Sequence, residues 1–126
     1  MLIIRRMDTK GFTVETCPIR NILDRFGDKW SILVMIVLQQ NTIMRFNEMS
    51  KAIPDISQKM LTVTLRTLET DGLIKRTIYA QVPPKVEYEL TGMGISLLEH
   101  VNGLVKWAVE NTSAINTSRQ EYAEAR

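Results

Sequence analysis

The sequence predicts a mainly α-helical fold that carries one small antiparallel β-hairpin. First, Leu61, Leu65 and Leu68 recur at the i, i+4 and i+7 spacing of one helix face. Second, the apolar period shortens to two after Gly72, in two segments separated by the proline-containing residues 81–84, as in two strands joined by a turn. Third, a wide apolar stripe indicates a long last helix. Together these elements predict a winged helix-turn-helix that dimerises through its terminal helices.

Length and composition describe one domain of ordinary soluble composition. The chain has 126 residues, of which 44% are apolar and 24% are charged. Its 16 Lys and Arg residues against 14 Asp and Glu residues leave a net charge of +2, so any attraction to DNA depends on charge placement. One cysteine excludes an internal disulfide framework and fits a reducing cytoplasm. No apolar run approaches the ~18 residues that a transmembrane helix needs, so we expect a cytoplasmic protein without a membrane partner.

The N-terminal part is predicted to hold an arm and two helices. Residues 1–16 show no clear period and are expected to form a flexible arm, with an ordered dimer contact as the alternative. Pro18 suits the first turn of a helix that ends at Gly27, and Asp28 can cap the next helix. That next helix is apolar almost all round, which indicates a central, buried position. We therefore expect Trp30 to be a core residue and not a binding residue.

A helix-turn-helix pair is predicted between Phe46 and Asp71. A short helix covers Phe46 to Ile53, and the Pro54-Asp55 pair breaks it. Ser57 can cap the second helix by accepting a hydrogen bond from a first-turn amide, and that helix stops at Asp71-Gly72. In such a pair the second helix enters the major groove of DNA while the first helix crosses the backbone.

Polar and basic side chains gather on the second helix and on the hairpin. Amide, hydroxyl, ammonium and guanidinium groups can contact base edges or phosphates. The helix face opposite the leucines also includes Val63. An alternative is a solvated face that keeps the protein soluble, which Glu87 and Glu89 in the hairpin mildly favour. The candidate DNA-binding residues are Ser57, Gln58, Lys59, Thr62 and Arg66 in the helix, and Lys75, Arg76 and Lys85 in the hairpin.

The last helix, which Thr91 can cap, has more apolar surface than one winged-helix domain can cover. Its stripe runs from Leu97 to Ala108, and Trp107 adds to it. We expect this surplus to contact a partner subunit, while an intrachain contact with the first helix is an alternative that can hold as well. From Thr112 onward the chain is polar and is expected to fray, with a weak extension of the helix through residues 121–125 as the alternative. The predicted division is an arm over 1–16, a winged helix-turn-helix domain over 17–111 and a polar tail over 112–126.

The chain offers few residues for catalysis or metal binding. It has one histidine, His100, and one cysteine, Cys17, which cannot form a zinc cluster. The two lie far apart in sequence, and nothing further supports a Cys–His nucleophile pair. No glycine-rich phosphate loop is present. We therefore expect a protein that is not an enzyme and that needs neither a cofactor nor a metal.

Several short motifs occur in a fixed order over most of the chain. They are Cys17-Pro18, Gly27-Asp28-Lys29-Trp30, Ser57-Gln58-Lys59-Met60-Leu61, Leu65-Arg66-Thr67-Leu68-Glu69, Asp71-Gly72-Leu73-Ile74 and Pro83-Pro84-Lys85-Val86-Glu87-Tyr88-Glu89-Leu90-Thr91. From Cys17 to Trp107 the chain thus resembles the HxlR-type transcriptional regulators, which are MarR-like winged helix-turn-helix proteins. It departs from the resemblance at Gly27-Asp28, where a double glycine is expected, and this departure concerns a helix junction.

The resemblance implies a homodimer that binds double-stranded DNA at an inverted-repeat operator and regulates transcription. The effector is unknown. The alternative is a winged-helix module that mediates protein–protein contacts without binding DNA. The DNA-binding regulator and the protein-contact module differ in how their binding affinity should respond to salt. Contacts to DNA phosphates release counterions, whereas contacts to a protein do not.

Cys17 is a possible redox sensor. It precedes Pro18 at the start of a helix, where free amides stabilise a nearby thiolate. Some HxlR-type regulators have an equivalent cysteine that senses quinones, aldehydes or oxidants, and the resemblance implies the same role here. The alternative is a small buried apolar side chain, which free cysteine usually is. With no second cysteine in the chain, oxidation must end in a disulfide between subunits or with a small thiol.

Overall fold

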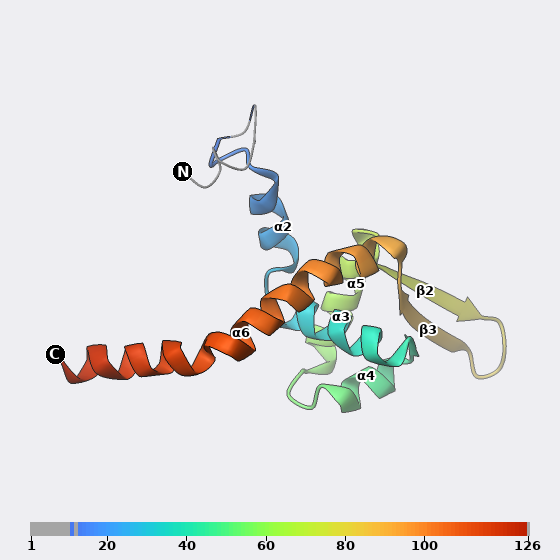
Figure 1. The fold of residues 1–126 in the computed structure, drawn as a ribbon. Helices are drawn as coiled ribbons and strands as arrows, with labels where there is room; N and C mark the ends of the chain where they lie inside the picture. Colours follow the sequence, from blue (N-terminus) through green and yellow to red (C-terminus); the bar gives the residue numbers. More distant parts are fainter. Residues whose placement is uncertain (1–10, 12, 126) are drawn as a thin grey trace.

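The computed structural model describes residue 11 and residues 13–125, so most of the predicted N-terminal arm lies outside the described residues. Figure 1 shows a core of helices and strands from which α2 and the far half of α6 extend. The predicted fold class, mainly α-helical with a small antiparallel sheet, is confirmed. The elements are α2 (Pro18–Phe26), α3 (Lys29–Asn41), β1 (Ile43–Met44), α4 (Phe46–Ala52), α5 (Gln58–Thr70), β2 (Ile74–Tyr79), β3 (Lys85–Leu90) and α6 (Gly92–Glu124).

The junction between α2 and α3 is built by Gly27 and Asp28. Gly27 ends α2, and its amide donates to the Leu23 carbonyl at 2.9 Å. The Asp28 carboxylate caps α3, since it accepts from the Ser31 amide at 2.9 Å and from the Ser31 hydroxyl at 3.0 Å. An aspartate at this position therefore supplies the cap of α3, which a second glycine could not do with a side chain.

Helix α3 is the centre of the core, as its all-round apolar sequence predicts. Val34, Met35 and Leu38 are fully or almost fully buried, and α3 contacts α4, α5, α6 and the sheet. Trp30 is half-buried and packs against the edge of this core. The Lys29 ammonium lies 4.3 Å from the centre of the Trp30 ring.

Helices α4 and α5 form the predicted helix-turn-helix. Ser57 caps α5 as expected, because its hydroxyl accepts from the Met60 amide at 3.0 Å. At the other end Gly72 takes a left-handed conformation with φ +78°, which a residue with a Cβ rarely adopts. Ile56 in the turn is buried between the two helices' apolar residues.

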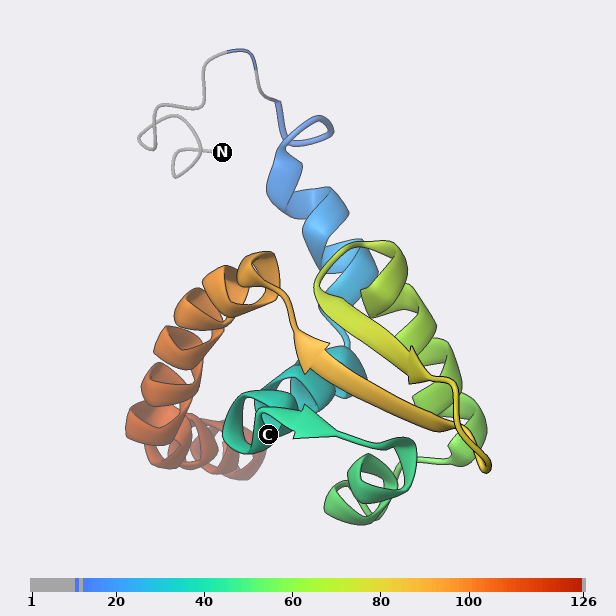
Figure 2. The same cartoon turned by 90° about the vertical axis from the view of Figure 1, so that its right-hand side faces the viewer.

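The wing is a three-stranded antiparallel sheet with strand order β1-β3-β2 (Figure 2). Strands β2 and β3 pair from Ile74 opposite Leu90 to Tyr79 opposite Lys85, as the period of two predicts. The sequence predicted only these two strands, and β1 was missed. β1 consists of two residues, Ile43 and Met44, paired with Glu89 and Tyr88. A two-residue strand is too short to show alternation, so it carries no periodic signal.

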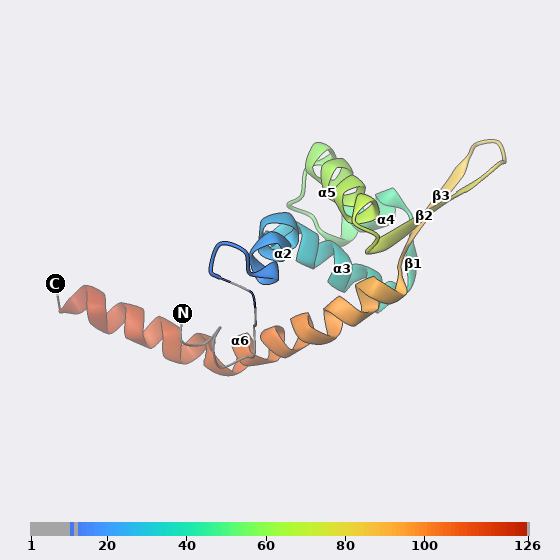
Figure 3. The same cartoon turned by 90° about the horizontal axis from the view of Figure 1, so that it is seen from above.

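Helix α6 is longer than predicted. Its cap is Thr91, whose hydroxyl accepts from the Gly94 amide at 3.1 Å and donates to the Gly72 carbonyl at 2.6 Å. The expected fraying after Thr112 is wrong, because the helix continues to Glu124. The final turns contain good helix formers such as Gln120 and Glu124, whose side chains also interact at the i, i+4 spacing. In Figure 3 the wing and the distal end of α6 lie at opposite ends of the molecule.

None of the helices in the described part of the chain is long and apolar enough to span a lipid bilayer.

Candidate nucleic-acid interface

Helix α5 has a buried leucine face and an exposed, mainly polar face, on which Val63 is an exposed apolar residue. Leu61, Leu65 and Leu68 on one face are fully or almost fully buried, because they pack against the core around α3. The predicted contact residues of α5 project from the other side and are exposed to solvent. These residues are Ser57, Gln58, Lys59, Thr62 and Arg66. The fold thus presents one polar helix face to solvent and anchors the opposite face.

The hydroxyl groups of this face are already oriented. The Thr62 hydroxyl donates to the Gln58 carbonyl at 2.9 Å, so it retains acceptor capacity toward a partner. The Ser57 hydroxyl accepts from the Met60 amide and keeps its own proton for donation. A phosphate oxygen is an acceptor and suits Ser57, whereas an exocyclic amino group of a base suits Thr62.

The basic residues differ in whether a partner already neutralises them. Within the described residues Lys59, Arg66 and Arg76 form no ion pair, and neither does Lys75. The Lys85 ammonium lies 3.5 Å from a Glu87 carboxylate oxygen and 4.6 Å from the centre of the Tyr79 ring. The first four charges are therefore available to an anionic partner, while the charge of Lys85 is partly satisfied inside the wing.

The same carboxylate also affects Tyr79. A hydrogen bond to Glu87 and the negative charges of Glu87 and Glu89 raise the pKa of the Tyr79 phenol above its ordinary value. Tyr79, Lys85 and Glu87 thus form a compact polar cluster near the wing tip.

A cleft of about 270 Å³ lies between helix α5 and the wing. Arg66 from α5 and Arg76 from β2 both line it, although they are ten positions apart in sequence. Glu69 lines the same cleft, and Phe46, Leu65 and Tyr88 contribute apolar surface to it. The fold therefore brings two predicted cations of separate elements to one concave surface.

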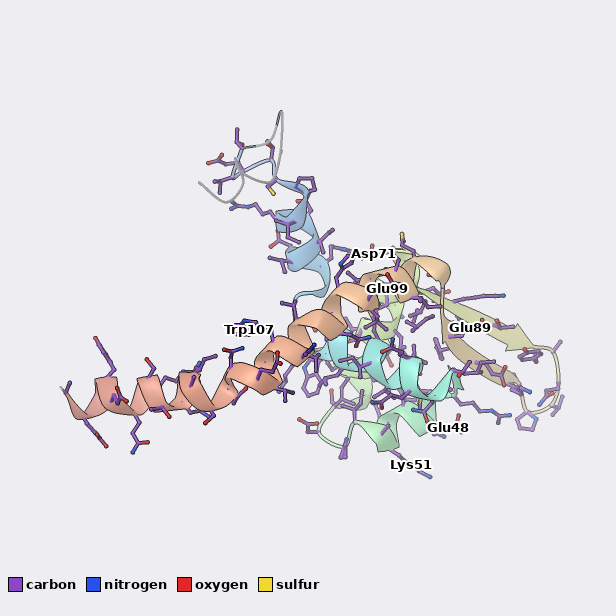
Figure 4. All side chains as sticks on the ribbon, in the orientation of Figure 1. Glu48, Lys51, Asp71, Glu89, Glu99 and Trp107 are labelled. Atoms are coloured by element: carbon purple, nitrogen blue, oxygen red, sulfur yellow. The ribbon has the colours of Figure 1, made fainter. Side chains whose placement is uncertain are left out.

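Two further cations were missed by the sequence prediction. Arg45, which caps α4, and Lys51 in the last turn of α4 are both exposed. Figure 4 shows the Lys51 side chain extending from α4 away from the rest of the domain. The signal for both was present, because the first helix of a helix-turn-helix crosses the DNA backbone.

Cys17 lies at the N-cap position of α2, and its side chain makes no capping hydrogen bond. It is 8% exposed. This burial supports the alternative interpretation of Cys17 as a small apolar packing residue. Among the described residues no three His, Cys, Asp or Glu side chains are grouped as a metal site requires.

An ion pair connects α2 to the end of α5. The Arg25 guanidinium donates two hydrogen bonds to the Asp71 carboxylate, at 2.8 and 2.9 Å. This fork-like geometry and the negative charge of Asp71 raise the pKa of Arg25. Asp71 is the C-cap of α5, so the pair links the N-terminal helix to the start of the wing.

An apolar groove lies away from this interface, between α2, α3 and α6. Helix α2 contributes Ile19 and Leu23, which are 53% and 60% exposed. Helix α6 contributes Leu97, Val101 and Leu104 to the opposite wall. Beyond the groove Trp107, labelled in Figure 4, is 56% exposed on the part of α6 that leaves the domain. The apolar stripe of α6 is thus divided: its first turns pack on the core, and its later turns face solvent.

Comparison with known proteins agrees with this architecture. Residues 25–116 match the model of the HxlR-like helix-turn-helix family. The chain is 45% identical over 101 residues to the HTH-type transcriptional regulator YdeP of Bacillus subtilis, covering 80% of this chain and 78% of YdeP. It is 40% identical over 105 residues to the regulator YybR of the same organism, covering 83% of each chain.

A solved structure is also similar. The redox regulator HypR in its reduced form superposes with a TM-score of 0.75 at 39% sequence identity, over 80% of this chain and 99% of HypR. Family and relatives are transcriptional regulators, and the winged helix-turn-helix described above is the DNA-binding fold that they share. The chain belongs to the HxlR-like helix-turn-helix family of transcriptional regulators.

Proposed function

We propose that the protein is a homodimeric regulator that binds an inverted-repeat operator with α5 in the major groove of each half-site. One observation carries this proposal. The exposed face of α5 presents Lys59 and Arg66 without an ion-pair partner among the described residues, directly opposite a fully anchored leucine face. A helix that is rigidly packed on one side and free on the other can enter a groove without rearrangement.

The contacts divide by chemistry. Gln58, Lys59, Thr62 and Arg66 lie on the helix that enters the groove, so they are assigned to base edges and flanking phosphates. Ser57 donates to a phosphate. The charges on α4 and the wing flank this helix and are assigned to the backbone; they are Arg45, Lys51, Lys75 and Arg76. Lys85 is assigned a minor role in DNA binding, because its ammonium group already forms an ion pair with Glu87.

The second subunit is placed on the groove between α2, α3 and α6. An isolated helix is marginally stable in water unless its apolar face is packed. Helix α6 nevertheless runs to Glu124 with Leu104 and Trp107 exposed, and the exposed isoleucine and leucine side chains of α2 lie beside the same groove. A second copy that covers these side chains would bury apolar surface of both helices and place two α5 helices about one DNA turn (~34 Å) or a small multiple apart.

The proposal is tested by selecting bound fragments from the source genome and measuring their affinity at several salt concentrations. We expect an inverted repeat and a steep fall of affinity between low and moderate salt. A winged-helix module for protein contacts should instead select no sequence and respond weakly to salt. Sedimentation at micromolar concentration should show a dimer, and Leu104→Glu should shift it toward monomer.

We also propose that any thiol-based response passes through Cys17, the only cysteine of the chain. The similarity to the redox regulator HypR and the position at the start of α2 support this. Since Cys17 is buried, oxidation requires an opening of the α2 start. After mild oxidant, non-reducing electrophoresis and intact mass should show a disulfide-linked dimer or a mixed disulfide, together with changed operator affinity. A Cys17→Ser variant that keeps the full response would contradict the proposal.

A further inference from the structure

Val63 is the apolar residue at the middle of the DNA-facing side of α5. Lys59 precedes it by four residues and Arg66 follows it by three, which is the spacing of a single stripe along a helix. Leu61 and Leu68 lie on the far side of the same helix and are completely buried. Val63 therefore points away from the core and lies between two cations that have no ion-pair partner in the described chain.

The chain itself does not explain a valine here. The side chain is 46% exposed, so it contributes little to the core. A β-branched residue is also a poorer helix former than the lysine, glutamine or alanine that a solvated position tolerates equally well. Val63 does border a cleft with Met60 and Trp30, but this cleft is open to solvent, and Val63 remains 46% exposed beside it.

The major groove offers a defined partner for an apolar side chain. Each base pair presents donors and acceptors there, and the thymine C5-methyl group is the one apolar feature among them. The isopropyl group of valine has no donor or acceptor, so it gains nothing from the other edges and leaves their polar groups without water. In contrast, against a methyl group it buries apolar surface on both sides.

We infer that Val63 selects a thymine in each half-site by packing on its C5-methyl group. This inference rests on the proposed entry of α5 into the major groove. Lys59 and Arg66 hold the neighbouring phosphates or guanines, so the thymine should lie within one or two base pairs of the position that Arg66 contacts. The inference thus names both the base that Val63 contacts and its position in the half-site. The charge and the fold of the protein alone specify neither.

The test uses the full-length protein and the operator obtained by fragment selection. Each thymine of one half-site is replaced in turn by deoxyuridine, which removes the methyl group and keeps every hydrogen-bonding group. At one position the wild-type affinity should fall about fourfold, the equivalent of one buried methyl group. The symmetric position of the other half-site should behave alike, and both replacements together should cost about fifteenfold.

Variants at Val63 connect the methyl effect to this side chain. Val63→Ala should weaken binding to the thymine operator and should lose no further affinity on the deoxyuridine operator. Val63→Thr keeps the shape and half of the methyl surface, so it should retain part of the discrimination. Val82→Ala is the matched control, because Val82 is fully exposed at the wing tip and should leave the deoxyuridine effect unchanged. Thermal unfolding of each variant confirms that folding is intact.

The outcomes separate the inference from the proposed function. If the wild type binds its operator but no deoxyuridine replacement lowers affinity, the inference is wrong and DNA binding stands. The same holds if Val63→Ala retains the full deoxyuridine effect. If the wild type selects no DNA fragment, the proposed function fails and the inference fails with it.

Discussion

Helices α5 and α2 follow the same sequence principle but lie in opposite environments. Both show apolar residues at helical spacing, and in both a polar or conformationally special residue marks the ends. The leucines of α5 are buried in their own domain, whereas Ile19 and Leu23 of α2 remain exposed. Periodicity therefore predicts that a helix has an apolar face, and it does not predict whether the same chain covers that face.

The same contrast exists within α6. Its first turns lie against the core through Leu98 and Val101, while Leu104 and Trp107 face solvent. The molecule thus has an inner region whose apolar residues are buried within the chain, and an outer region whose apolar residues are exposed. The following predictions test this division, from the largest expected effect to the smallest.

The largest effect is expected from a cavity in the inner region. Leu61→Ala removes a completely buried side chain, and it should lower the free energy of unfolding by about 2–5 kcal/mol. The matched change in the outer region, Leu23→Ala, should have little effect on the unfolding of the monomer and should instead weaken the proposed dimer. Denaturant unfolding at several protein concentrations measures both quantities. Equal destabilisation of the monomer by both changes would contradict the division into two regions.

A second contrast compares two glycines of α6. A Cβ added to Gly94 would overlap the Leu73 carbonyl oxygen, so Gly94→Ala should destabilise the protein by about 1–3 kcal/mol. Nothing lies within 4 Å of the corresponding position at Gly103, where alanine should stabilise the helix by about 0.5–1 kcal/mol. Thermal or denaturant unfolding measures the stability of both variants. A stabilising effect of Gly94→Ala would show that the first turn of α6 is not tightly packed.

The third contrast concerns free and paired cations at the interface. Arg66→Ala should weaken operator binding by about 1–3 kcal/mol if Arg66 contacts a base, and equally on all sequences if it contacts a phosphate. Lys85→Ala should have a smaller effect, because Glu87 already neutralises part of the charge of the ammonium group. Arg119→Ala, far along α6, serves as the control. A larger loss for Lys85 than for Arg66 would reverse the assignment of their roles.

The smallest expected effect is a titration in the wing. The raised pKa of Tyr79 means that the folded state favours the protonated phenol. The contribution of the Tyr79 phenol to the free energy of unfolding is therefore fully present below the ordinary tyrosine pKa. This contribution is lost as the pH rises through the raised pKa. Glu87→Gln should lower the Tyr79 pKa toward its ordinary value, and Glu89→Gln should lower it less. Phenolate absorbance, measured with Tyr88 and Tyr122 replaced by Phe, reports the shift.

Sequence reasoning was strongest where local signals agreed with burial. The helix α5, its Ser57 cap and its Gly72 stop were all predicted, because a leucine stripe, a hydroxyl and a glycine point to the same boundaries. The two-residue strand β1 was missed, since so short a segment shows no period. Helix α6 extends beyond the predicted boundary at Thr112, because the polar segment that follows contains good helix formers.

The candidate interface was predicted in part for similar reasons. Positions on α5 follow directly from helical geometry, so the exposure of Lys59 and Arg66 could be foreseen. The pairing of Lys85 with Glu87, and the shared cleft of Arg66 and Arg76, depend on how the wing folds against α5. The link between Arg25 and Asp71 spans 46 residues and leaves no local pattern in the sequence.

The continuity of α6 has a mechanical consequence. Its 33 residues extend for ~50 Å along the helix axis. Its N-cap residue, Thr91, is hydrogen-bonded to Gly72, next to the end of α5. The helix therefore begins beside α5, carries Leu104 and Trp107 of the proposed dimer contact in its first half, and continues beyond them to Glu124. In the proposed dimer, a small change in the angle at which the two α6 helices cross would alter the separation of the two α5 helices without changing their side chains. Regulation at the distal end would then act on operator spacing and not on base preference.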